Sequence, residues 1–109
     1  MATRFPCPYL HGEVELAEER ERHIAANHPD LLPEHRARLA DTLVDPDVVR
    51  LDIRAANTYL FSRWFGTVRG GKHVVVVVVA DNTAAGRDWI VTAYLTRRLS
   101  GGQSIWTRN

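Results

Sequence analysis

The chain has 109 residues, of which 45% are hydrophobic and 25% charged, a composition typical of a globular protein with one modest core. Its run of six valines is far shorter than the roughly 20 apolar residues of a membrane helix, and the first 20 residues lack the apolar stretch of a signal peptide. The formal net charge of +1 favours no class of partner by itself, and the lone Cys7 cannot form an internal disulfide. We therefore expect one cytoplasmic domain over residues 1–109, without a membrane segment.

The first half of the chain is predicted to be helical. Residues 1–12 are expected to form an N-terminal arm, and residues 13–44 a helical part. The segment 13–27 is rich in Glu, Ala and Arg, as helices are, and it should stop at His28 because Pro29 disfavours the helical conformation in the residue before it. A second helix is expected over residues 33–44.

The second half, residues 46–106, changes to the two-residue period of strands. Strands are predicted at residues 48–53, 58–65, 73–80 and 89–96, with a short fifth piece near 105–106. Two helices followed by closely connected strands predict an α+β fold, with two N-terminal helices packed on one face of a four- to five-stranded antiparallel sheet. In a simple meander the valine strand would be the third of four, between its sequence neighbours.

The six valines at 74–79 are apolar on both sides of their strand, so both faces of the sheet should be covered there. The helices would cover one face. The other would be a ligand surface, a homodimer interface, or a face covered by the C-terminal tail. Because register is not readable from a sequence, the strand side chains that share this face stay open.

Charge is divided unevenly along the chain. Residues 1–49 carry five arginines against ten acidic residues, a net charge of −5, whereas residues 50–109 have nine basic residues against three acidic ones, a net charge of +6. A positively charged sheet would attract a polyanion such as RNA. Solvated surface charges would give the same count.

His23 is the histidine most suited to chemistry. Leu16, Arg20, His23 and Asn27 follow one another at helical spacing, so His23 and an arginine would share one helix face. An imidazole can act as a general acid or base near a phosphate. A hydrogen-bonded packing role would explain the same position.

Cys7, His11, His23 and His28 form two close pairs of zinc-ligand types, although their spacing matches no common zinc pattern. A small zinc-stabilised domain is therefore one alternative. The nucleotide-binding loops GxxxxGK[ST] and GxGxxG are missing from the sequence.

Five strings in this order, HIAANHPD, TLVDPDVVR, LFSRWF, VVVVVVAD and WIVTAYLTRRLSGGQSIW, resemble small bacterial and phage proteins of the barnase, EndoU, colicin and RelE-like nuclease fold. The resemblance covers residues 13–106. It implies a RelE- or barnase-like fold and metal-independent RNA cleavage that needs no cofactor. The glutamate and histidine pair of the barnase type is missing from the sheet half, where the acidic residues are Asp52, Asp81 and Asp88.

The resemblance also implies roles for residues. His23 would be the base or acid, Arg63 the phosphate clamp and Thr92 a hydrogen-bond donor, with His28, Tyr94 and Arg97 as second choices for catalysis. Tyr59 and Phe61 would stack RNA bases, and Arg50 would bind substrate. The expected function is that of a toxin-type endoribonuclease whose partners are RNA and an antitoxin or other protein. The alternative is a non-catalytic module of the same fold that binds RNA or protein.

Overall fold

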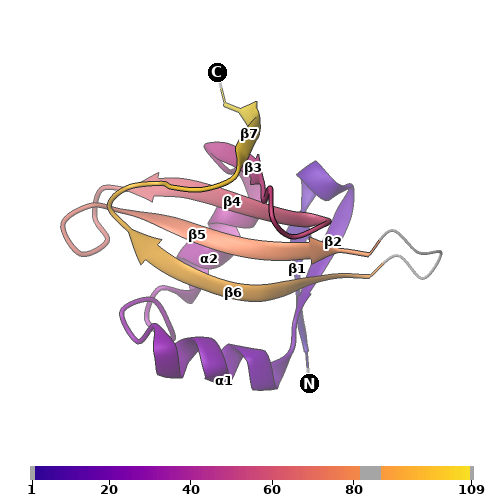
Figure 1. Ribbon diagram of the computed structural model, residues 1–109. Coiled ribbons are helices and arrows are strands. Elements are labelled where there is room, and N and C mark those ends of the chain that lie inside the picture. The colour runs from indigo at the N-terminus through magenta and orange to yellow at the C-terminus, as the bar shows by residue number, and fades with distance from the viewer. Residues whose placement is uncertain (1, 82–86, 109) are drawn as a thin grey trace.

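A computed structural model describes residues 2–81 and 87–108 of the chain, which form two α-helices and one seven-stranded sheet. The strands lie in the order β1-β2-β6-β5-β4-β3-β7 (Figure 1). Neither described helix has the length and apolarity needed to span a bilayer. The elements are β1 (Thr3–Cys7), the 3-10 turn η1 (Pro8–Leu10), β2 (Gly12–Leu16), α1 (Glu18–Asn27), α2 (Arg36–Val44), β3 (Val48–Leu51), β4 (Thr58–Phe65), β5 (Lys72–Ala80), β6 (Asp88–Thr96) and β7 (Gln103–Thr107).

The predicted four- to five-stranded antiparallel sheet is wrong, because the sheet is mixed and has seven strands. The two strands missing from the prediction, β1 and β2, pair antiparallel to each other, and β2 joins β6 in parallel through Glu15 and Trp89. Their buried residues alternate with exposed ones, Phe5 and Cys7 in β1 and Val14 and Leu16 in β2. This period of two overrides the helix-forming composition of residues 13–16, so the first helix begins at Glu18 and not at residue 13.

The central meander agrees with the sequence. Strands β3, β4, β5 and β6 are consecutive and antiparallel, and the valine strand β5 lies between β4 and β6, as predicted. The fifth strand piece also exists as β7, which pairs with β3. The first helix ends at Asn27, directly before His28 and Pro29.

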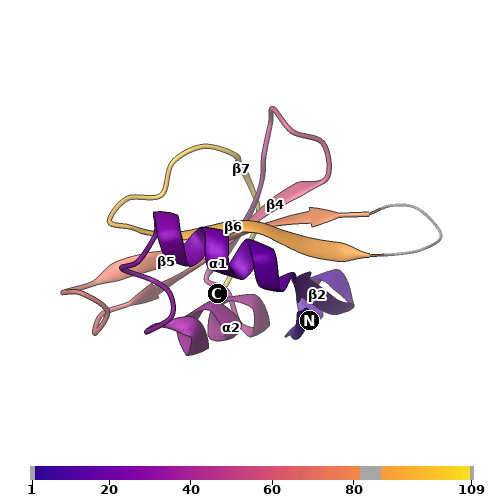
Figure 2. The same ribbon diagram turned by 90° about the horizontal axis from the view of Figure 1, so that it is seen from below.

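Helix α2 covers one face of the sheet, and α1 runs alongside β6, the strand that it contacts most (Figures 1 and 2). On the covered face, Val74, Val76 and Val78 of β5 belong to one buried cluster with Leu39 of α2 and Phe61 of β4. Helix α1 adds Ile24, which is also fully buried. The sequence predicts that both helices pack over one face of the sheet. The structure shows a different arrangement of the two helices. One covers the face and the other lies along the β6 side.

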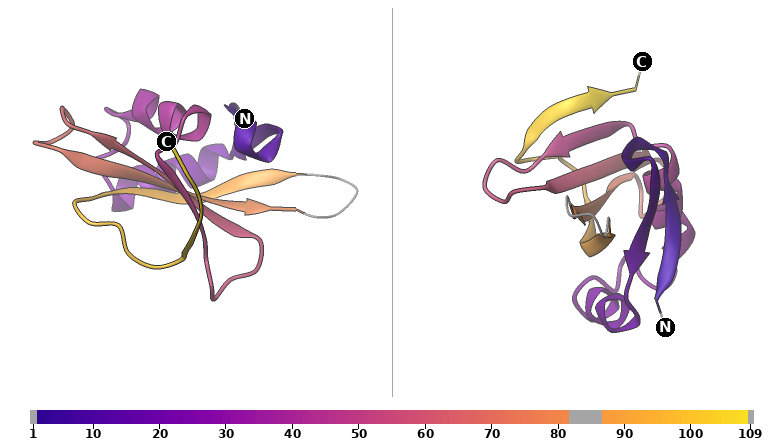
Figure 3. Two further views of the ribbon diagram at one scale, coloured as in Figure 1. Left: turned by 90° about the horizontal axis from the view of Figure 1, so that it is seen from above. Right: turned by 90° about the vertical axis from the view of Figure 1, so that its right-hand side faces the viewer.

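The other face is crossed by the chain itself. Because β6 and β7 lie on opposite sides of β5, β4 and β3, their connection, residues 97–102, must run across these strands (Figure 3). We call these residues the strap. A Cβ on Gly102 would lie 3.2 Å from the Cβ of Arg50 and 3.5 Å from Cδ1 of Leu60, so the strap lies directly on β3 and β4. Part of the second apolar face is thus covered by the C-terminal segment.

Candidate functional site

The open face is the side of β3 to β6 opposite α2. Its side chains follow from the register: Val77 of β5 is paired with Leu60 of β4 and with Thr92 of β6, and Val75 is paired with Tyr94. Paired residues of adjacent strands point to the same side of a sheet. Leu60, Val77, Thr92 and Tyr94 therefore share the open face, next to the strap.

A hollow of about 570 Å³ opens on this face. Its walls are two connections that rise on the side of the sheet away from α2, the strap and the loop between β3 and β4 (Figure 2). The floor is mainly apolar, whereas the walls carry Asp52, Arg54 and Ser100 beside the exposed Ile53, which suits a ligand with a flat apolar part and a charged part. Its lining consists of residues 52–54 and 100–102 with Leu60, Val77 and Tyr94.

His28 lies beside Tyr94, with 6.1 Å between the centres of their rings. The backbone of His28 is held on both sides, because its N–H donates to the Ile24 carbonyl at 2.7 Å and its carbonyl accepts from the Leu31 N–H at 3.0 Å. Thr92 precedes Tyr94 by two residues and faces the same side. The packing of α1 against β6 thus places His28 beside Tyr94, and Thr92 lies on the same side of β6 as Tyr94.

His23 lies elsewhere on α1. Its side chain is exposed, and its Nε2 is 3.1 Å from Nδ2 of Asn27. It lines a smaller hollow of about 270 Å³ together with Arg20, its predicted neighbour on the helix. Leu16, the third member of the predicted helix face, belongs instead to β2 and is buried.

Arg63 lies on the covered face, away from Thr92. It is paired with Val74, whose side chain belongs to the core beneath α2. Its guanidinium group is 3.6 Å from the carboxylate of Asp45 and lies over the Phe65 ring at 5.3 Å. The structure therefore does not bring His23, Arg63 and Thr92 together, because alternation along β4 turns residue 63 to the opposite side of the sheet.

Tyr59 and Phe61, the predicted base-stacking residues, also point to the covered face. Phe61 is fully buried in the core, and Tyr59 packs against Tyr9 with 6.4 Å between ring centres. Both rings are used in packing. Leu60, which lies between them in the sequence of β4, is the β4 side chain that lines the hollow.

Arg50, expected to bind substrate, is on the open face with its pairing partner Leu60, but it is 6% exposed and holds the strap. Its Nη1 donates to the carbonyls of Ser100 at 2.6 Å and Gly101 at 2.7 Å. Within the described residues, its Nε and Nη2 have no hydrogen-bond partner, and neither does Nδ1 of His73. Arg97, another predicted site residue, begins the strap and is exposed.

The four residues of the zinc alternative do not gather into a ligand set, since no three His, Cys, Asp or Glu side chains in residues 2–81 and 87–108 lie close enough to hold a metal ion. Cys7 is fully buried in the core. Burial raises the pKa of the Cys7 thiol to about 11, which disfavours the thiolate that a metal would need.

Sequence reasoning missed the two walls of the hollow. Arg54 is placed there by a turn in which its N–H donates to the Asp52 side chain at 2.7 Å. Gly101 and Gly102 let the strap turn with φ of 79° and 74°. The Ser-Gly-Gly string signals a turn, but nothing in the local sequence indicates that this turn lies over the sheet.

Comparisons with protein-family models, curated proteins and solved structures each found no match to this chain.

Proposed function

We propose that this protein binds single-stranded RNA on the open face and cleaves it by metal-independent acid–base chemistry at His28, Thr92 and Tyr94. The observation that carries this proposal is the contact of His28 with Tyr94 at the edge of the 570 Å³ hollow. Tyr94 belongs to both, because it lines the hollow and contacts the imidazole. A nucleotide in the hollow would therefore lie next to a group that can move a proton.

The proposed cleavage needs a base, an acid and a hydrogen-bond donor to the phosphate. The His28 imidazole takes the proton of a ribose 2′-OH, whose oxygen then forms a bond to phosphorus while the bond from phosphorus to the 5′-oxygen breaks. The Tyr94 hydroxyl or a water molecule gives a proton to that 5′-oxygen, and the product is a 2′,3′-cyclic phosphate. The Thr92 hydroxyl donates a hydrogen bond to the phosphate oxygen on which charge grows.

Cations near the hollow support an anionic ligand. Arg54 lines it, and Arg97 begins the strap three residues after Tyr94. Residues 50–109 carry a net charge of +6. Phosphate binding by these groups would weaken with added salt, because released counterions drive such binding.

A non-catalytic RNA-binding module is the second candidate. It is favoured by the position of Arg63, because the arginine expected to stabilise the transition state lies on the other face, paired with Asp45. Both candidates use the same surface, so they differ only in whether the RNA strand is broken.

The test is cleavage of single-stranded RNA with and without EDTA. We expect His28→Gln to lower the rate about 100-fold or more and Tyr94→Phe to lower it about tenfold. His11→Asn is the matched control. His11 is an exposed histidine at the β1–β2 hairpin with φ of 61°, a conformation that Asn accepts well. Its rate should equal that of the wild type.

Three results bear on the choice. Cleavage that persists in EDTA and fails in His28→Gln supports the nuclease. RNA binding without cleavage supports the second candidate and excludes the first. Cleavage that is unchanged in both His28→Gln and Tyr94→Phe would show that these side chains are not the catalytic ones.

A further inference from the structure

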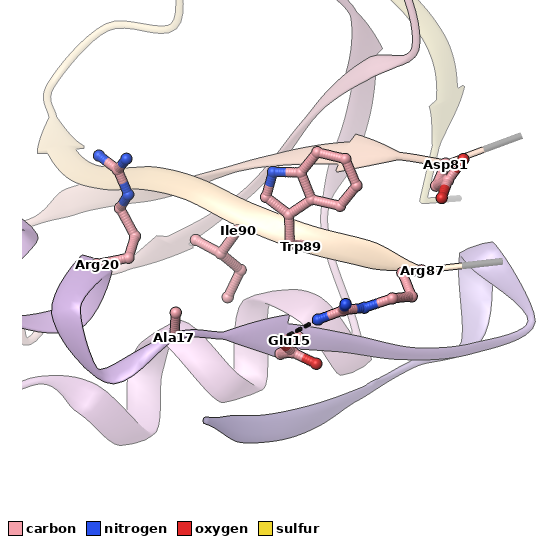
Figure 4. A pocket seen from close by; sticks show the side chains of 7 residues that line it. All are labelled: Glu15, Ala17, Arg20, Asp81, Arg87, Trp89 and Ile90. Carbon is pink, nitrogen blue, oxygen red and sulfur yellow. Dashed lines mark hydrogen bonds and ion pairs between the residues drawn. The ribbon is translucent and has the colours of Figure 1, made fainter. Parts of the chain in front are cut away.

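A second hollow, of about 460 Å³, lies between β2, the start of α1 and the start of β6 (Figure 4). Trp89 stands at its middle, Arg20 at one end and Asp81 at the other. The hollow is separate from the one beside Tyr94, because the two share no lining residue.

The Trp89 ring is accessible to a ligand. It is 43% exposed, although it lies in a strand that is hydrogen-bonded on both sides, to Val79 of β5 and Glu15 of β2. Its pairing with Val79 puts it on the open face, since Val79 alternates with Val78 of the core. An exposed indole on a sheet is a platform on which a nucleobase can stack.

The cation that can serve a phosphate here is Arg20. Arg87 also lines the hollow, but its Nη2 is already 2.8 Å from the Glu15 carboxylate. Within residues 2–81 and 87–108, Arg20 has no ion-pair partner. Its side chain rises on the same side of β6 as the Trp89 ring (Figure 4). The hollow thus offers an aromatic face next to a cation available for a new partner.

A neighbouring hollow, lined by Ala17, Glu19, Arg20 and His23, lies further along α1 and shares Ala17 and Arg20 with this one. Helix α1 starts near Trp89 and ends near Tyr94, so it runs along β6 in the same direction (Figure 1). From Arg20 to His28 the helix rises about 12 Å. A few nucleotides of single-stranded RNA can bridge that length.

We propose that this hollow is a second nucleotide subsite, in which a base stacks on Trp89 and its phosphate is bound by Arg20, with the RNA strand following α1 toward His28. The subsite rests on the proposed function only in taking RNA as its ligand. A second subsite implies that the substrate is single-stranded RNA of several nucleotides. It also places His23 beside the bound RNA, in a position that requires no proton transfer by its imidazole.

The experiment measures binding of a short single-stranded 2′-O-methyl RNA, which cannot be cleaved through its 2′ position, by fluorescence anisotropy. Trp89→Leu should weaken binding about tenfold or more, because the stacking platform is lost. Arg20→Gln should weaken it and reduce the slope of log affinity against log salt by about one phosphate contact.

Each variant has a matched control. Arg22→Gln removes an exposed arginine of the same helix that is paired with Glu18 at 3.0 Å. Trp106→Leu removes a tryptophan of similar exposure, 38%, on the distant strand β7. Both should bind the RNA like the wild type.

The outcomes separate this subsite from the function on which it rests. Wild-type affinity in both Trp89→Leu and Arg20→Gln, together with loss of cleavage in His28→Gln, would overturn the subsite and leave the nuclease proposal intact. No binding of the RNA by the wild-type protein would overturn both. A loss in the Trp89 and Arg20 variants that their controls do not share supports the subsite.

Discussion

The two faces of the sheet are built from the same strands but differ in how far their side chains are buried. On the covered face, Val74, Val76 and Val78 are fully buried with Phe61 in an apolar core. On the open face, Val75 is buried while Val77 and Val79 are partly exposed, and polar groups such as Arg50 are buried among them. One side of the valine run therefore holds the fold together, whereas the other is a floor that is only partly covered.

Apolar residues on a strand therefore do not by themselves mark the core. The open face keeps apolar side chains within reach of solvent because two connections rise around them and leave a hollow between. An exposed apolar floor of this kind is a feature of binding grooves and of interfaces between proteins. The difference between the faces can be tested by mutations on each.

The largest expected effect is on the covered face. Phe61→Ala removes a fully buried ring from the core and should lower the free energy of unfolding by about 3–5 kcal/mol. Urea denaturation followed by circular dichroism measures the change.

The matched change on the open face is Val77→Ala, which should cost about 1 kcal/mol because the side chain is only partly buried. Equal losses for Phe61→Ala and Val77→Ala, after allowance for side-chain size, would mean that the two faces are equally buried in solution.

An effect smaller than that of Phe61→Ala is expected at Arg50, which fixes the strap. Arg50→Met removes the donor to the Ser100 and Gly101 carbonyls and should lower the free energy of unfolding by about 2 kcal/mol. The strap should also become more mobile, so trypsin should cut faster after Arg97 and Arg98. Limited proteolysis followed by mass spectrometry locates the cuts.

Arg54→Met is the control, because Arg54 is exposed in the neighbouring loop and does not hold the strap. A strap that resists trypsin equally in the wild type and in Arg50→Met would show that these hydrogen bonds do not hold it.

The smallest effect is expected at His73, whose ring lies 4.9 Å from that of Trp64. Burial lowers the pKa of His73, an effect that Asp47 opposes and Arg50 reinforces. The neutral imidazole is therefore favoured in the folded state. Its contribution to stability is complete above the ordinary pKa of 6.5 and is lost as the pH falls below that value toward the lowered pKa of the folded protein.

The measurement compares the urea midpoints of the wild type and His73→Gln at about pH 7.5 and about pH 5. The wild type should lose more stability on acidification than His73→Gln does. An identical pH dependence in the wild type and His73→Gln would contradict the assigned pKa direction.

Some of the site could be read from the sequence. Pro29 predicts that α1 ends before His28, and the two-residue period predicts a strand over residues 89–96. Both predictions are confirmed. The contact between His28 and Tyr94 cannot be predicted from the sequence, because it depends on how α1 packs along β6. Arg63 shows the same limit, since a strand of correct extent still leaves open which of its two sides meets the core.

The sequence by itself determined the elements that local chemistry controls: the valine strand and its two sequence neighbours, the end of the first helix at a proline, and the uneven charge of the two halves. The tertiary structure alone decided that β1 and β2 join the sheet, that the strap crosses the open face, and that His28 rather than Arg63 lies beside Tyr94. The physical reason is that composition and period fix a local backbone conformation, whereas register and packing depend on contacts between residues far apart in the chain.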